Sequence, residues 1–280
     1  KIKGYIKTPV VSAAGNEIVF GWASGAIAQG TTNAISFSNT TAGTYDIDFN
    51  TMTYEAAPFI KLMFAGSEMT MVDDNNYKIE KEFTKGQVIE VSGIANFNDW
   101  WIDSDFFQKG TDGKLTFLPV SGKYRITANF ERNYFIVEHM NGNDLSALDK
   151  DGNAIWVIGW GIGKPTHDNN VNWSPDKGLC MAKIGDKKFQ LTFKPYPVTF
   201  NGDGTIANKY DFKFFYQKNW GGEFLGADYV STQTDMIYMT ESGNFQAAAD
   251  LILDPAKWYV ITMDLTQGNK KAVMTLAEKK

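Results

Sequence analysis

Apolar and polar residues alternate with a period of two along several segments of this 280-residue sequence. Between Lys123 and Phe130, the residues Tyr124, Ile126 and Ala128 share the parity of Phe130, and polar residues occupy the positions between them. Successive side chains of a strand point to opposite faces, so this pattern predicts a half-buried β-strand. The same alternation recurs at Phe189–Phe193, Tyr210–Tyr216 and Tyr259–Leu265.

The segments between the predicted strands are rich in Gly, Asn and Asp, which favour turns. Examples are Thr111–Gly113, Asn141–Asp144 and Asn201–Gly204. The segment Ser242–Leu253 also fits a helical spacing, but its first residues repeat a turn-and-strand pattern found elsewhere in the chain. We therefore interpret it as a strand, and the sequence predicts an all-β fold.

One hairpin pattern, a turn followed by an aromatic strand, occurs three times, at Ala42–Ile47, Ser121–Ile126 and Ala256–Ile261. Unequal spacing between the copies indicates related sandwiches with loop insertions and not a regular solenoid. The polar stretch Asn141–Asn153 is the best candidate for a boundary. We therefore predict two tandem antiparallel β-sandwich domains, residues 1–145 and 146–280.

Composition excludes several functional classes. The formal net charge of -5 makes nucleic acid an improbable partner, and no apolar run approaches the roughly 18 to 20 residues of a membrane-spanning helix. A single cysteine, Cys180, and two histidines, His139 and His167, leave little for disulfides or for zinc and iron–sulfur sites. We expect no metal and no cofactor.

Three segments of the C-terminal half carry a family resemblance: Ile155–Trp160, Tyr210–Phe215 and Asn219–Gly226. Their order, Phe-Lys-Phe, then Trp-Gly, then an aromatic residue with Gly, resembles the starch-binding modules of SusE/SusF-type outer-membrane lipoproteins. The resemblance covers residues 154–280 and, weakly, 59–139 through Asp99–Trp101 and the Gly-Lys-Tyr hairpin. It implies small β-sandwich modules at the cell surface that bind glucans without catalysis, beside a transport complex.

A sugar ring has an apolar C–H face and a rim of hydroxyls, so its binding site needs an exposed aromatic platform and polar partners. The segment Trp160–Trp173 supplies both, with Trp160, Lys164, Asn172 and Trp173 as candidates. The alternative is that Trp160 ends a buried strand, since it shares a strand face with Trp156 and Ile158, and that Trp173 only fastens the loop.

A second candidate segment, Tyr216–Trp220, offers Lys218 and Asn219 as hydroxyl partners beside Trp220. In the resembling modules this Trp-Gly turn helps to hold the fold, so a packing role for Trp220 is the stronger alternative. Trp100 and Trp101 form a third candidate, because adjacent indoles on a strand point to opposite faces and at most one can enter a one-sided core. Trp22, flanked by glycines, is expected in the core.

The predicted function is non-catalytic binding of a glucan-type polysaccharide or oligosaccharide at the cell surface, within a glycan-uptake system whose other outer-membrane proteins are candidate partners. The alternatives are a glycoside hydrolase or accessory hydrolase, and a structural subunit that docks other proteins. The carboxylates lie scattered among turns, and no spacing fixes a catalytic pair. We expect an outer-membrane location with a lipid anchor on an N-terminal segment upstream of Lys1.

Overall fold

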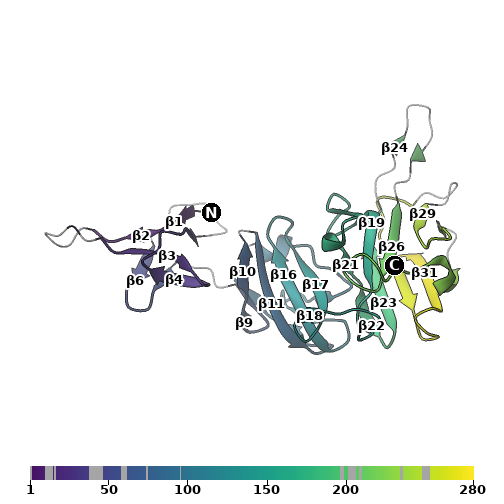
Figure 1. The fold of residues 1–280 in the computed structure, drawn as a ribbon, viewed down its shortest axis with the longest axis horizontal. Coiled ribbons are helices and arrows are strands. Elements are labelled where there is room, and N and C mark those ends of the chain that lie inside the picture. Colours follow the sequence, from purple (N-terminus) through teal and green to yellow (C-terminus); the bar gives the residue numbers. More distant parts are fainter. Residues whose placement is uncertain are drawn as a thin grey trace. The chain divides into compact units, whose positions relative to one another are not determined.

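The computed structural model describes residues 2–9, 15, 17–37, 47–57, 62–73, 75–94, 96–195, 199–200, 206–207, 210–233, 236–247 and 253–280. Within these ranges the regular structure is strand, with three short 3₁₀ helices, η1 (Phe97–Asp99), η2 (Pro175–Lys177) and η3 (Gly226–Asp228) (Figure 1). The described part of the chain contains no helix long and apolar enough to cross a membrane. The predicted all-β fold class is confirmed.

The chain divides into two compact units. Unit 1 comprises residues 1–79, 89–100 and 127–133, and unit 2 comprises residues 80–88, 101–126 and 134–280. Unit 2 thus combines residues from both sides of the expected boundary between residues 145 and 146. That boundary stays a prediction.

Unit 1 contains several small antiparallel sheets. They are β1 (Ile2–Gly4) with β5 (Ile35–Phe37); β2 (Ile6–Lys7), β3 (Val19–Ala23) and β4 (Ala26–Gln29); β6 (Asp48–Asn50) with β7 (Glu55–Ala57); and β13 (Val91–Ser92), β8 (Met63–Phe64) and β9 (Ser67–Glu68). Ser24 and Gly25 join β3 to β4 with positive φ at both positions, as a two-residue hairpin turn requires. Trp22 on β3 is partly buried against a core of Phe20, Ile27, Ile35 and Ala56. The first predicted hairpin, Ala42–Ile47, lies outside the described residues apart from Ile47.

A five-stranded sheet has the order β10 (Thr70–Asp73), β11 (Asn76–Phe83), β16 (Gly122–Asn129), β17 (Tyr134–Asn141) and β18 (Asp144–Leu145). A three-stranded sheet has the order β12 (Val88–Ile89), β15 (Leu115–Phe117) and β14 (Phe107–Lys109). Strand β16 is the predicted strand at residues 123–130. Its side chains Tyr124, Ile126 and Ala128 are buried, and those between them are partly exposed, which confirms the alternation.

The C-terminal part of unit 2 is a sandwich of two sheets. One sheet has the order β22 (Ala182–Gly185), β23 (Lys188–Phe193), β30 (Tyr259–Asp264), β31 (Ala272–Glu278) and β27 (Tyr229–Gln233). The other has the order β20 (Asn170–Asn172), β19 (Trp156–Gly163), β26 (Asp211–Phe215), β29 (Phe245–Ala247) and β28 (Ile237–Met239), with β21 (Leu179–Cys180) also paired to β19. A short pair, β24 (Thr199–Phe200) and β25 (Ile206–Ala207), completes the described strands. The pairing is antiparallel except between β27 and β31, which run parallel.

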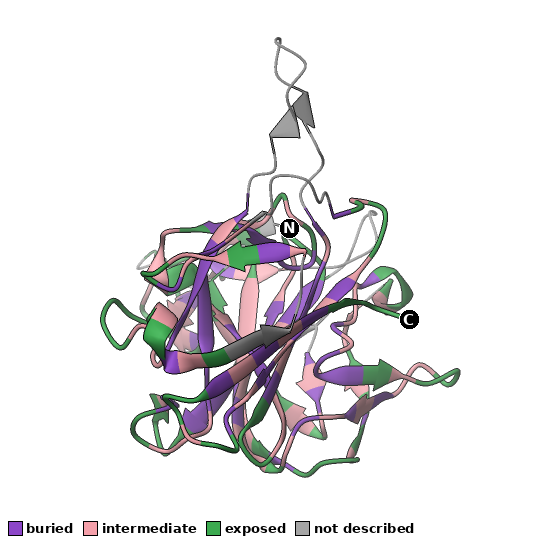
Figure 2. Cartoon of the chain, turned by 90° about the vertical axis from the view of Figure 1, so that its right-hand side faces the viewer, coloured by how far each residue is buried: buried purple, intermediate pink, exposed green. Residues whose placement is uncertain are grey.

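The two sheets of the sandwich share one apolar core. It includes Leu191 and Ile261 from one sheet and Val157, Phe212 and Phe245 from the other. Burial alternates along β30 and β31, which turn one face of their sheet to this core, whereas β19 and β26 in the other sheet are buried along most of their length (Figure 2). Strands β23, β26 and β30 occupy the three other predicted segments. Alternating burial is confirmed along β30, whereas the last three residues of β23 and the last four of β26 are all buried, because both faces are covered there. Residues 245–247 form β29, in agreement with the strand interpretation, whereas residues 248–252 lie outside the described part.

Candidate functional site

Strand β19 separates the sandwich core from an outer face. Val157 points into the core, whereas Trp156 and Ile158 are fully buried in a second cluster, on the opposite side, together with Phe215 of β26. Trp160 has the parity of this outer face but is 48% exposed. The outer face, as we call this side of the sheet, is therefore covered at Trp156 and open at Trp160.

Glycines around Trp160 explain why this indole projects from the sheet. Gly159 has a φ of 134°, and a Cβ there would lie 2.2 Å from the carbonyl oxygen of Asp211. A Cβ on Gly163 would lie 2.6 Å from the carbonyl oxygen of Thr166. The register between β19 and β20 shifts between Gly159 and Gly163, which marks a bulge, and bulges re-aim side chains. Trp160 is thus an exposed ring on a backbone that tolerates few substitutions.

Polar groups lie beside Trp160. Asp211 on β26 is its direct cross-strand partner, and paired residues have Cβ atoms about 4.5 to 5.5 Å apart. Oδ1 of Asp211 accepts a hydrogen bond of 2.8 Å from the Asn244 side-chain amide. Asn172 is exposed, but it is paired with Gly159, the residue before Trp160, so its side chain projects from the opposite face of the sheet. An aromatic ring with a fixed carboxylate and an amide nearby matches the two surfaces of a sugar.

The second candidate segment forms a closed turn on the outer face. The Asn219 side chain accepts a hydrogen bond from the backbone N–H of Trp220, at 2.8 Å, and Gln217 donates to the Trp220 carbonyl, at 2.9 Å. The Trp220 ring meets Phe215 edge-on, with 6.0 Å between centroids, yet remains 50% exposed. One edge of the Trp220 ring therefore packs against the sheet, and half of its surface remains accessible to a ligand.

Lys218 and Trp173 make contacts within the protein. The Lys218 ammonium lies 2.6 Å from a Glu138 carboxylate oxygen and 5.4 Å from the centre of the Trp156 ring. Trp173 is partly buried against the cluster that contains Trp156. Both residues pack against the covered part of the outer face.

Lys164 requires a correction, because its side chain is buried and cannot reach a ligand at the surface. Its ammonium lies 2.6 Å from Asp103 and 2.8 Å from Asp105. Burial raises the pKa of Asp103 to about 6, against the attraction of Lys164. Burial also acts to raise the pKa of Asp105, but Lys164 and hydrogen bonds from Gln190 and Thr192 outweigh it and lower that pKa to about 2. We call these three charged residues the buried triad.

Trp100 also requires a correction, because it is only 6% exposed and meets Phe130 edge-on at 5.1 Å within unit 1. The residue that follows it, Trp101, is half-buried and stacks on Trp258 at 5.7 Å within unit 2. The expectation that at most one of the two indoles enters a core holds for these positions. Neither ring presents an open platform like that of Trp160.

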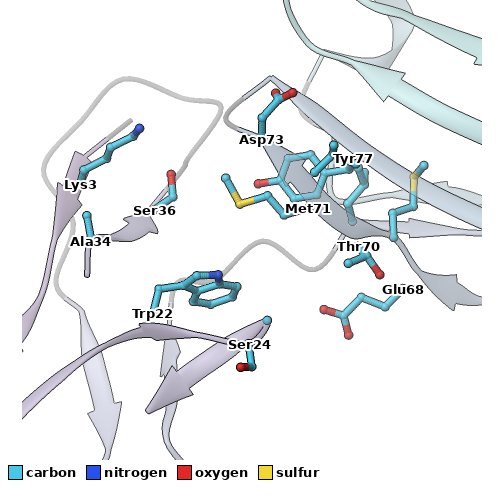
Figure 3. Close-up of a pocket in the computed structure, with 14 residues that line it drawn as sticks. Lys3, Trp22, Ser24, Ala34, Ser36, Glu68, Thr70, Met71, Asp73 and Tyr77 are labelled. Carbon is cyan, nitrogen blue, oxygen red and sulfur yellow. The ribbon is translucent and has the colours of Figure 1, made fainter. Parts of the chain in front are cut away.

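Unit 1 contains a pocket of about 850 Å³ (Figure 3). Its lining includes the aromatic side chains of Trp22 and Tyr77 and the charged side chains of Lys3, Glu68 and Asp73. Pockets of this size and mixed lining are typical of small-ligand sites. The sequence assigned no function to this region, since Trp22 was expected in the core.

The sequence missed Asp211 and Asn244 as neighbours of Trp160. Asp211 begins a strand recognised by its alternation, but which residue stands opposite it depends on strand register, which a single sequence does not reveal. In the described part of the chain, no three His, Cys, Asp or Glu side chains are grouped in a way that could hold a metal ion.

Comparisons with known proteins give two family matches and a likeness to a solved structure. A family model described as Domain of unknown function (DUF5125) matches residues 1–148, and one described as Domain of unknown function (DUF5121) matches residues 149–266. The search of curated proteins finds no match. The crystal structure of SusF from Bacteroides thetaiotaomicron is similar with 16% identity and a TM-score of 0.28, over 79% of this chain. The chain spans 50% of the length of that SusF chain.

Proposed function

The chain belongs to the family described as Domain of unknown function (DUF5125), and we propose that it binds a glucan-type polysaccharide without catalysis. The observation that carries the proposal is the exposed Trp160 ring, held by a glycine-rich bulge beside Asp211. The bulged backbone holds the main chain of Trp160 in place before a sugar binds, so less backbone ordering opposes the stacking energy. Trp160 is the platform in this proposal.

Four of the sequence candidates are accessible on this sandwich: Trp160, Asn172, Asn219 and Trp220. We assign Trp220 with Asn219 to a second sugar contact near Phe215. Asn172 faces the other side of the sheet from Trp160 and is not assigned to this site. Lys218 and Trp173 support the surface from below through their contacts with Glu138 and the Trp156 cluster. Trp101 keeps a packing role through its stack on Trp258.

The carboxylates of the outer face favour binding over hydrolysis. Glu223 lies opposite Phe215, four residues along β26 from Asp211, which is roughly 13 Å at about 3.3 Å per residue. Glycosidases hold their two carboxyl groups about 5 to 5.5 Å or about 6.5 to 9.5 Å apart. Glu223 is also paired with the Lys213 ammonium. Asp103 and Asp105, which share the Lys164 ammonium, are buried in the triad.

The location follows from the motif resemblance. We propose that the protein acts at the outer surface of the outer membrane, beside other proteins of a glycan-uptake system. Weak individual sites gain from avidity when neighbouring proteins hold one polymer.

The experiment that tests the function is affinity electrophoresis of the full chain in gels with soluble α-glucans, β-glucans and unrelated polysaccharides, with reducing-sugar release measured in parallel. We expect retardation by a glucan without product. Steady product release would show an enzyme, and unretarded migration in every gel would contradict glycan binding. Tyr5→Ala, which removes an exposed aromatic ring of unit 1, serves as the control for non-specific retardation.

A further inference from the structure

The strand register places four side chains in one row across the outer face. Trp160 on β19 is paired with Asp211 on β26, Asp211 with Gln246 on β29, and Gln246 with Tyr238 on β28. Residues paired directly across a sheet project from the same face. We call these four residues the cross-strand row.

The neighbouring positions confirm which face the row occupies. Phe212, Phe245 and Ile237 each stand next to a member of the row in sequence, and all three are buried in the sandwich core. Since consecutive side chains of a strand point to opposite faces, the row points away from that core. Its two ends are exposed aromatic rings, with Trp160 48% and Tyr238 49% exposed.

Hydrogen bonds hold the two polar members in place. Tyr238 donates its hydroxyl hydrogen to the side-chain oxygen of Gln246, and Asn244 donates to Oδ1 of Asp211. These contacts use the side-chain oxygen of Gln246 and Oδ1 of Asp211. The amide N–H groups of Gln246 and Oδ2 of Asp211 are the atoms that we assign to a ligand. Sugar hydroxyls both donate and accept, so they suit this mixed pair.

The spacing of the aromatic rings sets the size of the ligand. Adjacent strands lie about 4.8 Å apart, so three steps from β19 to β28 separate the two backbones by roughly 14 Å. That separation exceeds the width of one sugar ring. A ligand that stacks on both rings must therefore be a chain of several sugars lying across the strands.

We propose that the cross-strand row binds one linear glucan chain at two platforms, Trp160 and Tyr238, with Asp211 and Gln246 hydrogen-bonded to the sugars between them. This inference rests on the proposed glycan binding and specifies its ligand. The layout is unlike a protein-docking surface, which has an apolar centre and a polar rim. Here the polar side chains are central and the rings are at the ends.

The test is the dependence of affinity on chain length, measured by titration calorimetry with linear α-1,4-glucan oligosaccharides from the disaccharide to the octasaccharide, and with the β-1,4 series in parallel. The full chain should bind longer oligosaccharides more tightly until both rings are covered. Tyr238→Ala should remove this gain, roughly 5-fold to 150-fold given about 1 to 3 kcal/mol per stacked ring by analogy with base stacking, so that this variant binds the octasaccharide about as weakly as the disaccharide. Tyr238→Phe keeps the ring and should retain most of the gain.

Equal affinities for the disaccharide and the octasaccharide, or wild-type length dependence in Tyr238→Ala, would overturn the two-platform row. If Trp160→Ala still weakened binding in that case, the proposed function would stand without the row. Absence of binding to both series and to every polysaccharide of the gel screen would instead remove the proposed function and the row together. Because Tyr238 is exposed, the melting temperatures of Tyr238→Ala and Tyr238→Phe should match that of the wild type.

Discussion

The ammonium group of Lys164 lies 2.8 Å from Oδ2 of Asp105, and both side chains are almost completely buried. Asp105 lies in the part of the chain matched by the first family model, and Lys164 in the part matched by the second. Both charges of a buried ion pair have lost their hydration. Removal of one partner therefore leaves the other charge buried without compensation, which is strongly destabilising. The buried triad therefore connects residues 101–126 to the C-terminal sandwich within unit 2.

Asp105→Asn should destabilise the protein by about 3 to 5 kcal/mol, because it removes a charge that Lys164, Gln190 and Thr192 all stabilise. Asp103→Asn should cost less, since burial already raises the pKa of Asp103 to about 6 and the amide resembles the protonated acid. Urea unfolding at pH 7 measures both. An equal loss of unfolding free energy in the two variants would contradict the different ionisation that we assign to Asp103 and Asp105.

A fragment of residues 146–280 should fold, because every residue of the sandwich core cluster falls between Leu148 and Leu276. It should be less stable than the full chain, having lost Asp103 and Asp105. Lys164→Met should therefore cost several kcal/mol in the full chain, of the size expected for a broken buried pair (about 3 to 5 kcal/mol), but little in the fragment. An unfolded fragment by circular dichroism would contradict the predicted domain boundary.

Stability should fall between about pH 6.5 and pH 4 through His139. Burial lowers the pKa of His139 to about 4, whereas an unfolded histidine titrates near 6.5. In that window the unfolded state binds the proton and the folded state does not, so acidification favours unfolding. Asp103 contributes with the opposite sign, because its raised pKa makes the folded state bind a proton first as the pH falls toward 6.

His139→Gln isolates the histidine contribution in this pH range. The variant keeps a side-chain partner for Ser146, whose hydroxyl lies 2.7 Å from Nδ1 of His139. Denaturant unfolding of wild type and variant at pH 7 and pH 5 should show a smaller loss on acidification in the variant. An identical loss in both proteins would assign the pH dependence to other groups.

Two tryptophans on one strand should respond oppositely to truncation. Trp156 is fully buried, so Trp156→Ala should cost about 3 to 5 kcal/mol. Trp160→Ala removes an exposed ring and should stay within about 0.5 kcal/mol of the wild type. Thermal melts of the two variants compare them directly, and a large fall in Tm for Trp160→Ala would make Trp160 a packing residue.

Local patterns in the sequence predicted the strands well, because alternation is a property of consecutive residues. Tyr124, Ile126 and Ala128 are buried as their spacing indicated. The row at the candidate site could not be found in this way, since Asp211, Gln246 and Tyr238 become neighbours of Trp160 through register across four strands. Lys164 was misassigned because its partner acids lie about 60 residues earlier in the chain.

The most direct test of the central claim is the affinity of Trp160→Ala for the polysaccharide that retards the wild-type protein, measured by affinity electrophoresis against Tyr5→Ala. Loss of one stacked ring, about 1 to 3 kcal/mol by analogy with base stacking, should weaken binding by roughly 5-fold to 150-fold while the Tm is unchanged. Tyr5→Ala should bind as the wild type does. Wild-type affinity in a folded Trp160→Ala protein would contradict Trp160 as the platform and, with it, this account of the outer face.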